Sequence, residues 1–161
     1  MSETSAARDG DERNGDVPDA ARRAVDIQHA RDSAAHSLGI EVLAASAGSV
    51  RLAMRVRSDM LNGHGICHGG LVFTLADTAF AYACNSHGVA MVAAGASIEF
   101  LAPASLGERL IATASETSRG ERHGLYDVTV CDQAGAVRAH FRGRCARLRA
   151  PPPHSTQEGL S

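Results

Sequence analysis

A glycine-rich loop that runs directly into a long apolar segment constrains this chain more than any other feature. The loop covers residues 62–70, and the apolar segment continues from it to residue 87. The glycines that end the loop permit a helix to begin there, and Gly88 supplies a stop. The pattern predicts one helix over residues 70–86. Because apolar residues fall on every side of that helix, we expect it to be buried.

Asp77 is the only formally charged side chain within this predicted helix. Burying a lone carboxylate costs free energy unless the group is paired or has a chemical role. Taken alone, the residues leave two interpretations open. Asp77 is either a hydrogen-bonded aspartate of the core or a catalytic group.

The rest of the chain predicts an α+β fold with an antiparallel sheet. Apolar residues recur near a period of 3.6 over residues 19–38, which indicates a helix. Alternating patterns separated by turn residues predict two strands before the loop and four after the long helix, at residues 40–45, 49–57, 89–101, 108–118, 124–131 and 137–145. Strands joined by hairpins favour an antiparallel sheet, and a highly curved sheet could wrap around the long helix.

Composition sets the domain organisation and excludes several functions. A chain of 161 residues suits one domain, which we place at residues 19–149 between an acidic disordered tail (1–18) and a second tail (150–161). The net charge of -2 gives no case for nucleic acid or an anionic membrane as a partner. No apolar run reaches the roughly 20 residues that span a bilayer. Without a visible secretory signal or a C-x-x-C pair, we expect reduced thiols and a cytoplasmic protein.

Several familiar kinds of active site fit the sequence poorly. His64, Cys67 and His68 lack the spacing of a zinc finger or of H-E-x-x-H, so no metal site is expected. No serine lies in a G-x-S-x-G turn. A nucleophilic Cys67 or Cys84 would need a histidine base brought in by folding, and Cys84 falls in the predicted buried helix.

The start of the long helix offers a better site. The first amides of a helix have no internal acceptors and carry partial positive charge, so the Gly69 N–H could stabilise the oxygen of a reacting carbonyl. Asp77 would attack that carbonyl or activate a water. Asn62 and His68 lie in the same loop and could orient the substrate or the water.

The spacing between these two groups has a geometric consequence. Gly69 and Asp77 are eight residues apart, which is about 12 Å along a helix. Two groups separated by that distance cannot both contact one reacting carbon. If both are catalytic, they come from different subunits, which predicts a two-fold dimer with composite sites.

Residues 60–70 and 75–86 closely resemble the PaaI-type hotdog-fold thioesterases, the hydroxyphenylacetyl-CoA thioesterases of phenylacetate catabolism. Shorter matches extend the similarity over residues 25–148, at 97–101, 124–128 and 141–144. The resemblance implies a hotdog fold, in which a curved antiparallel β-sheet wraps around one long central helix. It also implies a homodimer, and usually a tetramer built as a dimer of dimers.

The resemblance implies an acyl-CoA thioesterase that hydrolyses an aryl-acetyl-CoA to the free acid and CoA. Gly69 would donate its N–H to the thioester oxygen, and Asp77 of the facing subunit would be the nucleophile or general base. Asn62 and His68 would hold substrate and water. No metal or redox cofactor is implied, because CoA is part of the substrate.

Further residues would bind the substrate under the same resemblance. Gly70 and Thr78 lie beside the two catalytic positions, and Arg119 and Arg122 could pair with the CoA phosphates. Arg142 and Arg144 are further candidates, and an ordinary solvated face remains the alternative for all four arginines.

One departure from the family leaves the position of the water open. Some relatives place a serine or threonine on the strand after the helix to hold that water. In this chain residues 93–95 are alanine and glycine, and Ser97 is the first hydroxyl.

Two other functions are compatible with this reading of the sequence. A hotdog hydratase or dehydratase would act on enoyl thioesters, usually with a histidine and a carboxylate, for which His68 or His87 would have to serve. A non-catalytic acyl-CoA binding protein is the second alternative.

Overall fold

The structure, a computed structural model, describes residues 19–148. The two predicted tails, 1–18 and 150–161, lie outside the described residues. The described chain forms three α-helices, one short 3-10 helix and six strands: α1 (Ala20–Ala30), α2 (Ser33–Ser37), β1 (Glu41–Ser46), β2 (Ser49–Arg55), η1 (Ser58–Met60), α3 (Gly69–Asn85), β3 (Met91–Phe100), β4 (Arg109–Arg119), β5 (His123–Cys131) and β6 (Val137–Arg147).

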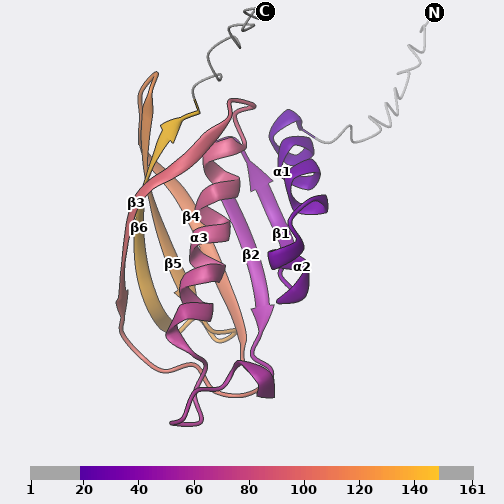
Figure 1. Ribbon diagram of the computed structural model, residues 1–161, viewed down its shortest axis with the longest axis vertical. Coiled ribbons are helices and arrows are strands. Elements are labelled where there is room, and N and C mark those ends of the chain that lie inside the picture. Colours follow the sequence, from indigo (N-terminus) through magenta and orange to yellow (C-terminus); the bar gives the residue numbers. More distant parts are fainter. Residues whose placement is uncertain (1–18, 149–161) are drawn as a thin grey trace, which may run out of the picture.

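The six strands form one antiparallel sheet in the order β1-β2-β4-β5-β6-β3. Figure 1 shows this sheet curving around α3, with α1 and α2 beside the β1 edge. The predicted α+β architecture and the predicted long helix are therefore confirmed. No helix of residues 19–148 has the length and hydrophobicity that crossing a membrane requires.

The inner side of α3 fills the concave face of the sheet. Phe80 is fully buried and packs against the rings of Tyr126 and Phe141, with centroid distances of 5.8 and 5.7 Å. Gly143 on β6 lies directly beneath Phe80, so a Cβ there would come within 2.8 Å of three of its ring atoms. Close contact between helix and sheet therefore depends on a glycine at this position.

Gly143→Ala is expected to lower the free energy of unfolding by about 1–3 kcal/mol, because the added Cβ would overlap the ring of Phe80, which is fully buried. Denaturant unfolding of the wild type and the variant measures this difference. Gly63→Ala is the control, since a Cβ at Gly63 would meet nothing within 4 Å. Equal midpoints for Gly143→Ala and the wild type would contradict the packing described.

The predicted single helix over residues 19–38 is wrong, because the chain breaks between α1 and α2. Asp32 caps α2: its Oδ1 accepts the Ala35 N–H at 2.9 Å. Its Oδ2 accepts the hydroxyl of Tyr82, a buried residue of α3, at 3.0 Å. Hydrophobic periodicity does not reveal such a cap, because the apolar pattern continues through the break between the two helices.

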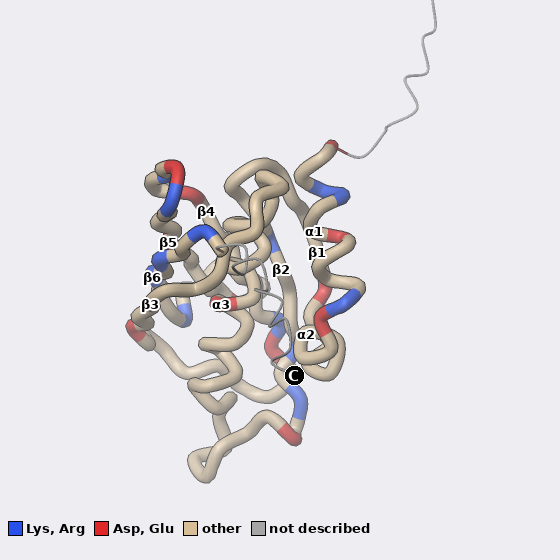
Figure 2. Tube along the Cα trace, turned by 45° about the horizontal axis from the view of Figure 1, so that its top comes forward, with Lys and Arg blue, Asp and Glu red and all other residues tan. Residues whose placement is uncertain are grey.

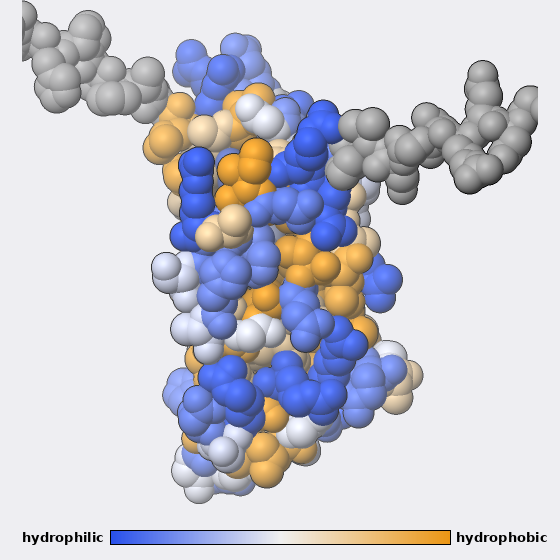
Figure 3. Space-filling model, turned by 90° about the vertical axis from the view of Figure 1, so that its right-hand side faces the viewer, coloured by the Kyte–Doolittle hydropathy of each residue, from blue (hydrophilic) through white to orange (hydrophobic). Residues whose placement is uncertain are grey.

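The prediction that α3 is buried on every side is also wrong for a single chain. Thr74, Asp77 and Ala81 form a half-buried stripe along the helix. The neighbouring edge strand β3 is exposed from Val92 to Ser97. Figure 3 views the molecule from the α1 side, where hydrophobic residues are scattered among hydrophilic ones, as on an ordinary surface.

Candidate active site

The amide of Gly69 is the free donor at the start of α3. Gly69 is the first residue of the helix. The next N–H groups have acceptors, since Gly70 donates to Nδ1 of His68 (3.0 Å) and Leu71 donates to the His68 carbonyl (2.9 Å). No atom of residues 19–148 accepts from the Gly69 N–H. The positive end of the helix therefore presents one unengaged donor.

Phe100, at the end of β3, explains why residue 69 is a glycine. A Cβ on Gly69 would lie 3.1 Å from Cζ of the Phe100 ring. The ring is 54% exposed, which is unusual for a side chain of this size. Phe100 therefore forms an aromatic wall beside the free amide, and sequence analysis did not identify it.

The loop before α3 uses its polar side chains in two different ways. His68 caps the helix through Nδ1, so only its Nε2 remains available to a ligand. Oδ1 of Asn62 accepts from the N–H groups of His64 (2.9 Å) and Ile66 (3.4 Å), which closes the loop. The side-chain NH₂ of Asn62 donates to no other described residue and remains free.

A cavity of about 350 Å³ opens beside these groups. Its lining is mostly apolar, and its residues come from the loop, the first turn of α3, the segment after β3 and β6: Asn62, Ile66, Cys67, Gly69, Val72, Phe100, Leu101, Ala102, Pro103, Ala104 and Arg138. A concave apolar site with a few polar groups is typical of small-molecule binding. We call it the Gly69 cavity.

Asp77 lies two turns further along α3 and is the only charged residue in the sequence of that helix. Figure 2 accordingly shows the red of acidic residues on the tube of α3. Its carboxylate has no hydrogen bond or ion pair with any residue between 19 and 148. Burial alone raises the pKa of Asp77 above its usual value of 3.8. A structural aspartate at this depth is normally hydrogen-bonded, and Asp77 lacks such bonds.

One chain does not bring Gly69 and Asp77 together. Eight residues of continuous helix separate them, which corresponds to about 12 Å. Asp77 does not line the Gly69 cavity. The hydroxyl of Thr78, the next residue, donates to the Thr74 carbonyl at 2.7 Å, and Thr78 is only 9% exposed.

Arg119 and Arg122 lie far from the Gly69 cavity. The cavity lies near the start of β4, since the Cys67 N–H donates to the Ala104 carbonyl. Both arginines belong to the hairpin at the other end of β4, an 11-residue strand about 33 Å long. Figure 1 shows that hairpin at the opposite end of the molecule from the start of α3.

The other two candidate arginines are engaged on β6. Arg142 donates to both carboxylate oxygens of Asp127, at 2.6 and 2.8 Å. Arg144 donates to the carbonyl of Ala94 on β3 at 3.0 Å. Neither residue lines the Gly69 cavity.

The structure argues against a cysteine nucleophile. Cys67 lines the cavity, but burial raises the pKa of its thiol. Burial likewise raises the pKa of the Cys84 thiol, which lies beside Cys145. Both side chains therefore remain protonated thiols at neutral pH, which are poor nucleophiles. Within residues 19–148, no three His, Cys, Asp or Glu side chains gather as metal ligands.

A histidine–carboxylate pair exists, but it lies away from the Gly69 cavity. Nε2 of His87 is 2.6 Å from Oε2 of Glu116, and the Tyr126 hydroxyl donates to the same oxygen at 2.7 Å. His87 follows the C-terminal end of α3, a 17-residue helix about 25 Å long. This distance separates the pair from the free amide.

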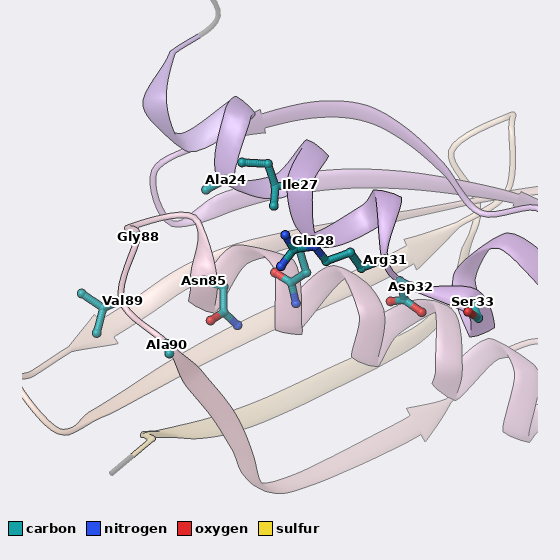
Figure 4. Close-up of a pocket in the computed structure, with 10 residues that line it drawn as sticks. All are labelled: Ala24, Ile27, Gln28, Arg31, Asp32, Ser33, Asn85, Gly88, Val89 and Ala90. Carbon is teal, nitrogen blue, oxygen red and sulfur yellow. The ribbon is translucent and has the colours of Figure 1, made fainter. Parts of the chain in front are cut away.

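A larger hollow of about 920 Å³ lies at the same end of α3 as His87. Figure 4 shows that its lining comes from α1, the start of α2, the end of α3 and the segment before β3. None of the site residues predicted from the sequence lines it. Asn85 at its floor is fully engaged, since its side chain bonds the backbone of Ala81 and Met91.

Comparison with known proteins identifies the family. Residues 64–139 match the model of the thioesterase superfamily. The acyl-coenzyme A thioesterase PaaI of Escherichia coli K12 is 45% identical over 117 residues, which cover 73% of this chain and 84% of that protein. This chain belongs to the thioesterase superfamily. It is therefore a thioester hydrolase, and the resemblance to PaaI-type enzymes drawn from its sequence is confirmed.

Solved structures of thioesterase-superfamily relatives agree with the hotdog fold. The E. coli PaaI protein of the phenylacetic acid degradation operon superposes with a TM-score of 0.80 and 41% identity, covering 81% of this chain and 95% of that chain. A Streptococcus mutans UA159 protein solved with acetyl CoA superposes with a TM-score of 0.67 and 26% identity, covering 70% of this chain and 91% of that chain. The predicted hotdog fold is confirmed.

Proposed function

We propose that this thioesterase hydrolyses aryl-acetyl-CoA thioesters, such as phenylacetyl-CoA or its ring-hydroxylated form, to the free acid and CoA. The observation that carries this proposal is the unengaged Gly69 amide, which opens onto an apolar cavity walled by Phe100. An amide in this position can donate a hydrogen bond to an attacked carbonyl oxygen and so stabilise its growing negative charge. An apolar aromatic wall suits an aryl group.

The reaction would need one group from each of two chains. The thioester oxygen would accept a hydrogen bond from Gly69 of one copy, and Asp77 of the facing copy would act on the carbonyl carbon. Asp77 would either attack directly or remove a proton from a water that attacks. If Asp77 attacks, the acyl–sulfur bond breaks as an acyl–Asp77 anhydride forms, and water then hydrolyses that anhydride to release the acid and regenerate Asp77. If Asp77 acts as a base, the water adds to the carbonyl carbon and the acyl–sulfur bond breaks as the acid forms. In both cases CoA leaves as the thiol, with a proton that comes from the water. The free NH₂ of Asn62 and Nε2 of His68 could hold substrate or water.

The uncovered surface supports a two-fold dimer with such composite sites. β3 is a 10-residue edge strand whose outer hydrogen-bonding edge is unpaired among residues 19–148. Long exposed edge strands readily pair with a second copy. The half-buried stripe of α3 that carries Asp77 is likewise left partly uncovered by the other residues of the described domain. Two such dimers would form the tetramer implied by the resemblance.

The named relatives support CoA esters as the substrate class. The E. coli PaaI protein is named an acyl-CoA thioesterase and comes from the phenylacetic acid degradation operon. The S. mutans protein was solved bound to acetyl CoA. CoA would thus be bound as part of the substrate, with no separate cofactor. A hydratase is less well supported, because the His87–Glu116 pair lies at the other end of α3 from the free amide.

A panel of CoA esters tests the substrate class. We expect kcat/KM for phenylacetyl-CoA and 4-hydroxyphenylacetyl-CoA to exceed that for acetyl-CoA and hexanoyl-CoA by about 10- to 100-fold, the range that a shaped apolar pocket provides. Equal values across the panel would contradict the aryl-acetyl assignment. Crotonyl-CoA, scored for hydration, tests the hydratase alternative.

The pH profile tests the role of Asp77. Either role requires the carboxylate, so activity is present above the pKa of Asp77 and is lost as the pH falls through it. Because burial raises that pKa, the acidic limb of kcat/KM is expected above pH 3.8. Circular dichroism at each pH separates this limb from acid unfolding. Full activity in a folded protein down to pH 3.8 would contradict the role.

A further inference from the structure

Arg138 on β6 is a cation at the Gly69 cavity that the sequence pattern does not distinguish. In the alternating sequence pattern of the strand it belongs to the same polar set as Arg142 and Arg144, which are both exposed. The side chain of Arg138 is only 17% exposed, and the residue lines the cavity together with Gly69 and Phe100. Its backbone carbonyl also accepts the N–H groups of Leu101 and Ala102, which belong to the same cavity wall.

Two carboxylates hold the guanidinium but leave one nitrogen unused. Nε and Nη2 of Arg138 donate to Glu108 at 3.2 and 3.0 Å, and Nη2 also donates to Asp132 at 2.7 Å. Nη1, which carries two N–H donors, has no acceptor within residues 19–148. Every fully buried side-chain nitrogen or oxygen of the described residues has a hydrogen-bond partner. Nη1 has none, so it is accessible to solvent.

The charge of this cluster indicates what Nη1 could bind. One guanidinium faces two carboxylates, so the cluster carries a net charge of about -1 when all three groups are ionised. Backbone N–H groups, chiefly that of Ala136, lower the pKa of Asp132 and keep it ionised. A site of net negative charge repels a phosphate. It suits a neutral oxygen acceptor, which gains a charge-assisted hydrogen bond.

We propose that Nη1 of Arg138 donates a hydrogen bond to an amide carbonyl of the pantetheine arm of the substrate, and not to a CoA phosphate. The proposal rests on the proposed function, because it places a CoA thioester at Gly69. In such a thioester the first pantetheine amide follows the sulfur after only two carbons, so it lies within the same small cavity. Arg138 is then a binding residue that fixes the arm while Gly69 holds the thioester oxygen.

Arg138→Lys is the informative variant. Lysine retains a positive charge for Glu108 and Asp132 but loses the forked donor that supplies Nη1. Arg22→Lys is the matched control, since the Arg22 guanidinium on α1 is also paired with a carboxylate, that of Asp26, and the residue is absent from the cavity lining. Circular dichroism confirms folding. If Arg138→Lys does not fold, Arg138→Gln combined with Glu108→Gln removes both charges together.

Three phenylacetyl thioesters locate the contact: those of CoA, of pantetheine, and of ethanethiol, which lacks any amide. We expect Arg138→Lys to lower kcat/KM about tenfold for the CoA and pantetheine esters, and less than twofold for the ethanethiol ester. A loss confined to the CoA ester would assign the contact to a phosphate and overturn the proposal. A loss that persists with the ethanethiol ester, or values equal to those of Arg22→Lys throughout, would also overturn it.

A second readout separates this proposal from the proposed function. This readout is the affinity for a non-hydrolysable ketone analogue of phenylacetyl-CoA, in which a methylene is inserted between carbonyl and sulfur. Its measurement needs no turnover. Arg138→Lys is expected to weaken the affinity about tenfold. If the wild type prefers another acyl group, the aryl-acetyl assignment fails. The three-thioester comparison then uses that acyl group and still decides the role of Arg138.

Discussion

Asp77→Asn is expected to lower kcat for phenylacetyl-CoA by about 10³-fold while KM changes less than about threefold. The amide cannot attack the carbonyl or accept a proton, but it keeps the shape of the side chain. Steady-state kinetics on the purified variant measures both constants. Turnover within tenfold of the wild type would show that Asp77 is not the catalytic carboxylate.

Asp127→Asn is the matched control for this variant. Asp127 is an aspartate of β5, so the same substitution can be made there within a regular element. Unlike Asp77, it is paired with Arg142 on β6, and this pairing lowers the pKa of its carboxyl. It touches neither Asp77 nor the Gly69 cavity. Its loss is therefore expected to leave kcat within about twofold of the wild type.

The stability of Asp77→Asn provides an independent check. Burial raises the pKa of Asp77, so ionisation of this group opposes folding once the pH exceeds 3.8, and the penalty is fully present above its folded-state pKa. Removing the charge is expected to raise Tm at pH 7, and the gain should disappear as the pH approaches 3.8. An inactive variant with a lowered Tm at pH 7 would instead indicate a structural role.

Gly69→Pro is expected to lower kcat by about 10²-fold, the usual effect of losing one oxyanion donor. Proline removes the N–H, yet the first position of a helix accepts it well. Gly69 does not need a positive φ, and the preceding residue, His68, has φ -61° and ψ 129°, a conformation compatible with a following proline. Activity equal to the wild type would exclude this amide as the donor.

The bulk of the new side chain needs its own control. Gly69→Ala keeps the N–H but places a Cβ 3.1 Å from the Phe100 ring, whose exposed tip can shift. Because the donor is retained, we expect Gly69→Ala to lower kcat by no more than about tenfold. A loss as large as that of Gly69→Pro would show that added bulk beside Phe100, and not the missing N–H, causes the effect.

The long helix and the sheet were predictable because their signals are local. The apolar run and its flanking glycines predicted a helix over residues 70–86, and the structure has it at Gly69–Asn85. The alternating strands and the turns between them identified the antiparallel sheet. The break at Asp32 was not predictable, because Tyr82, which helps to hold that cap in place, is 50 residues away along the chain.

The candidate site was only partly predictable for the same physical reason. Gly69, Asn62 and His68 share one loop, so their proximity follows from the sequence. Phe100 and Arg138 reach the cavity only through the pairing of β3 with β6, and no pattern in their own segments marks them. Thr78 lies next to Asp77 in the sequence, but its hydroxyl is bonded within the helix.

The central claim, that each active site combines Gly69 of one chain with Asp77 of another, is tested most directly by mixing two inactive variants. Co-expressed Asp77→Asn and Gly69→Pro chains, carrying different affinity tags, form mixed dimers in which one site is intact and the other carries both changes. Random pairing makes half of the dimers mixed, so about a quarter of the wild-type activity is expected to return. If the purified mixed dimers remain as inactive as either parent, the composite site is contradicted.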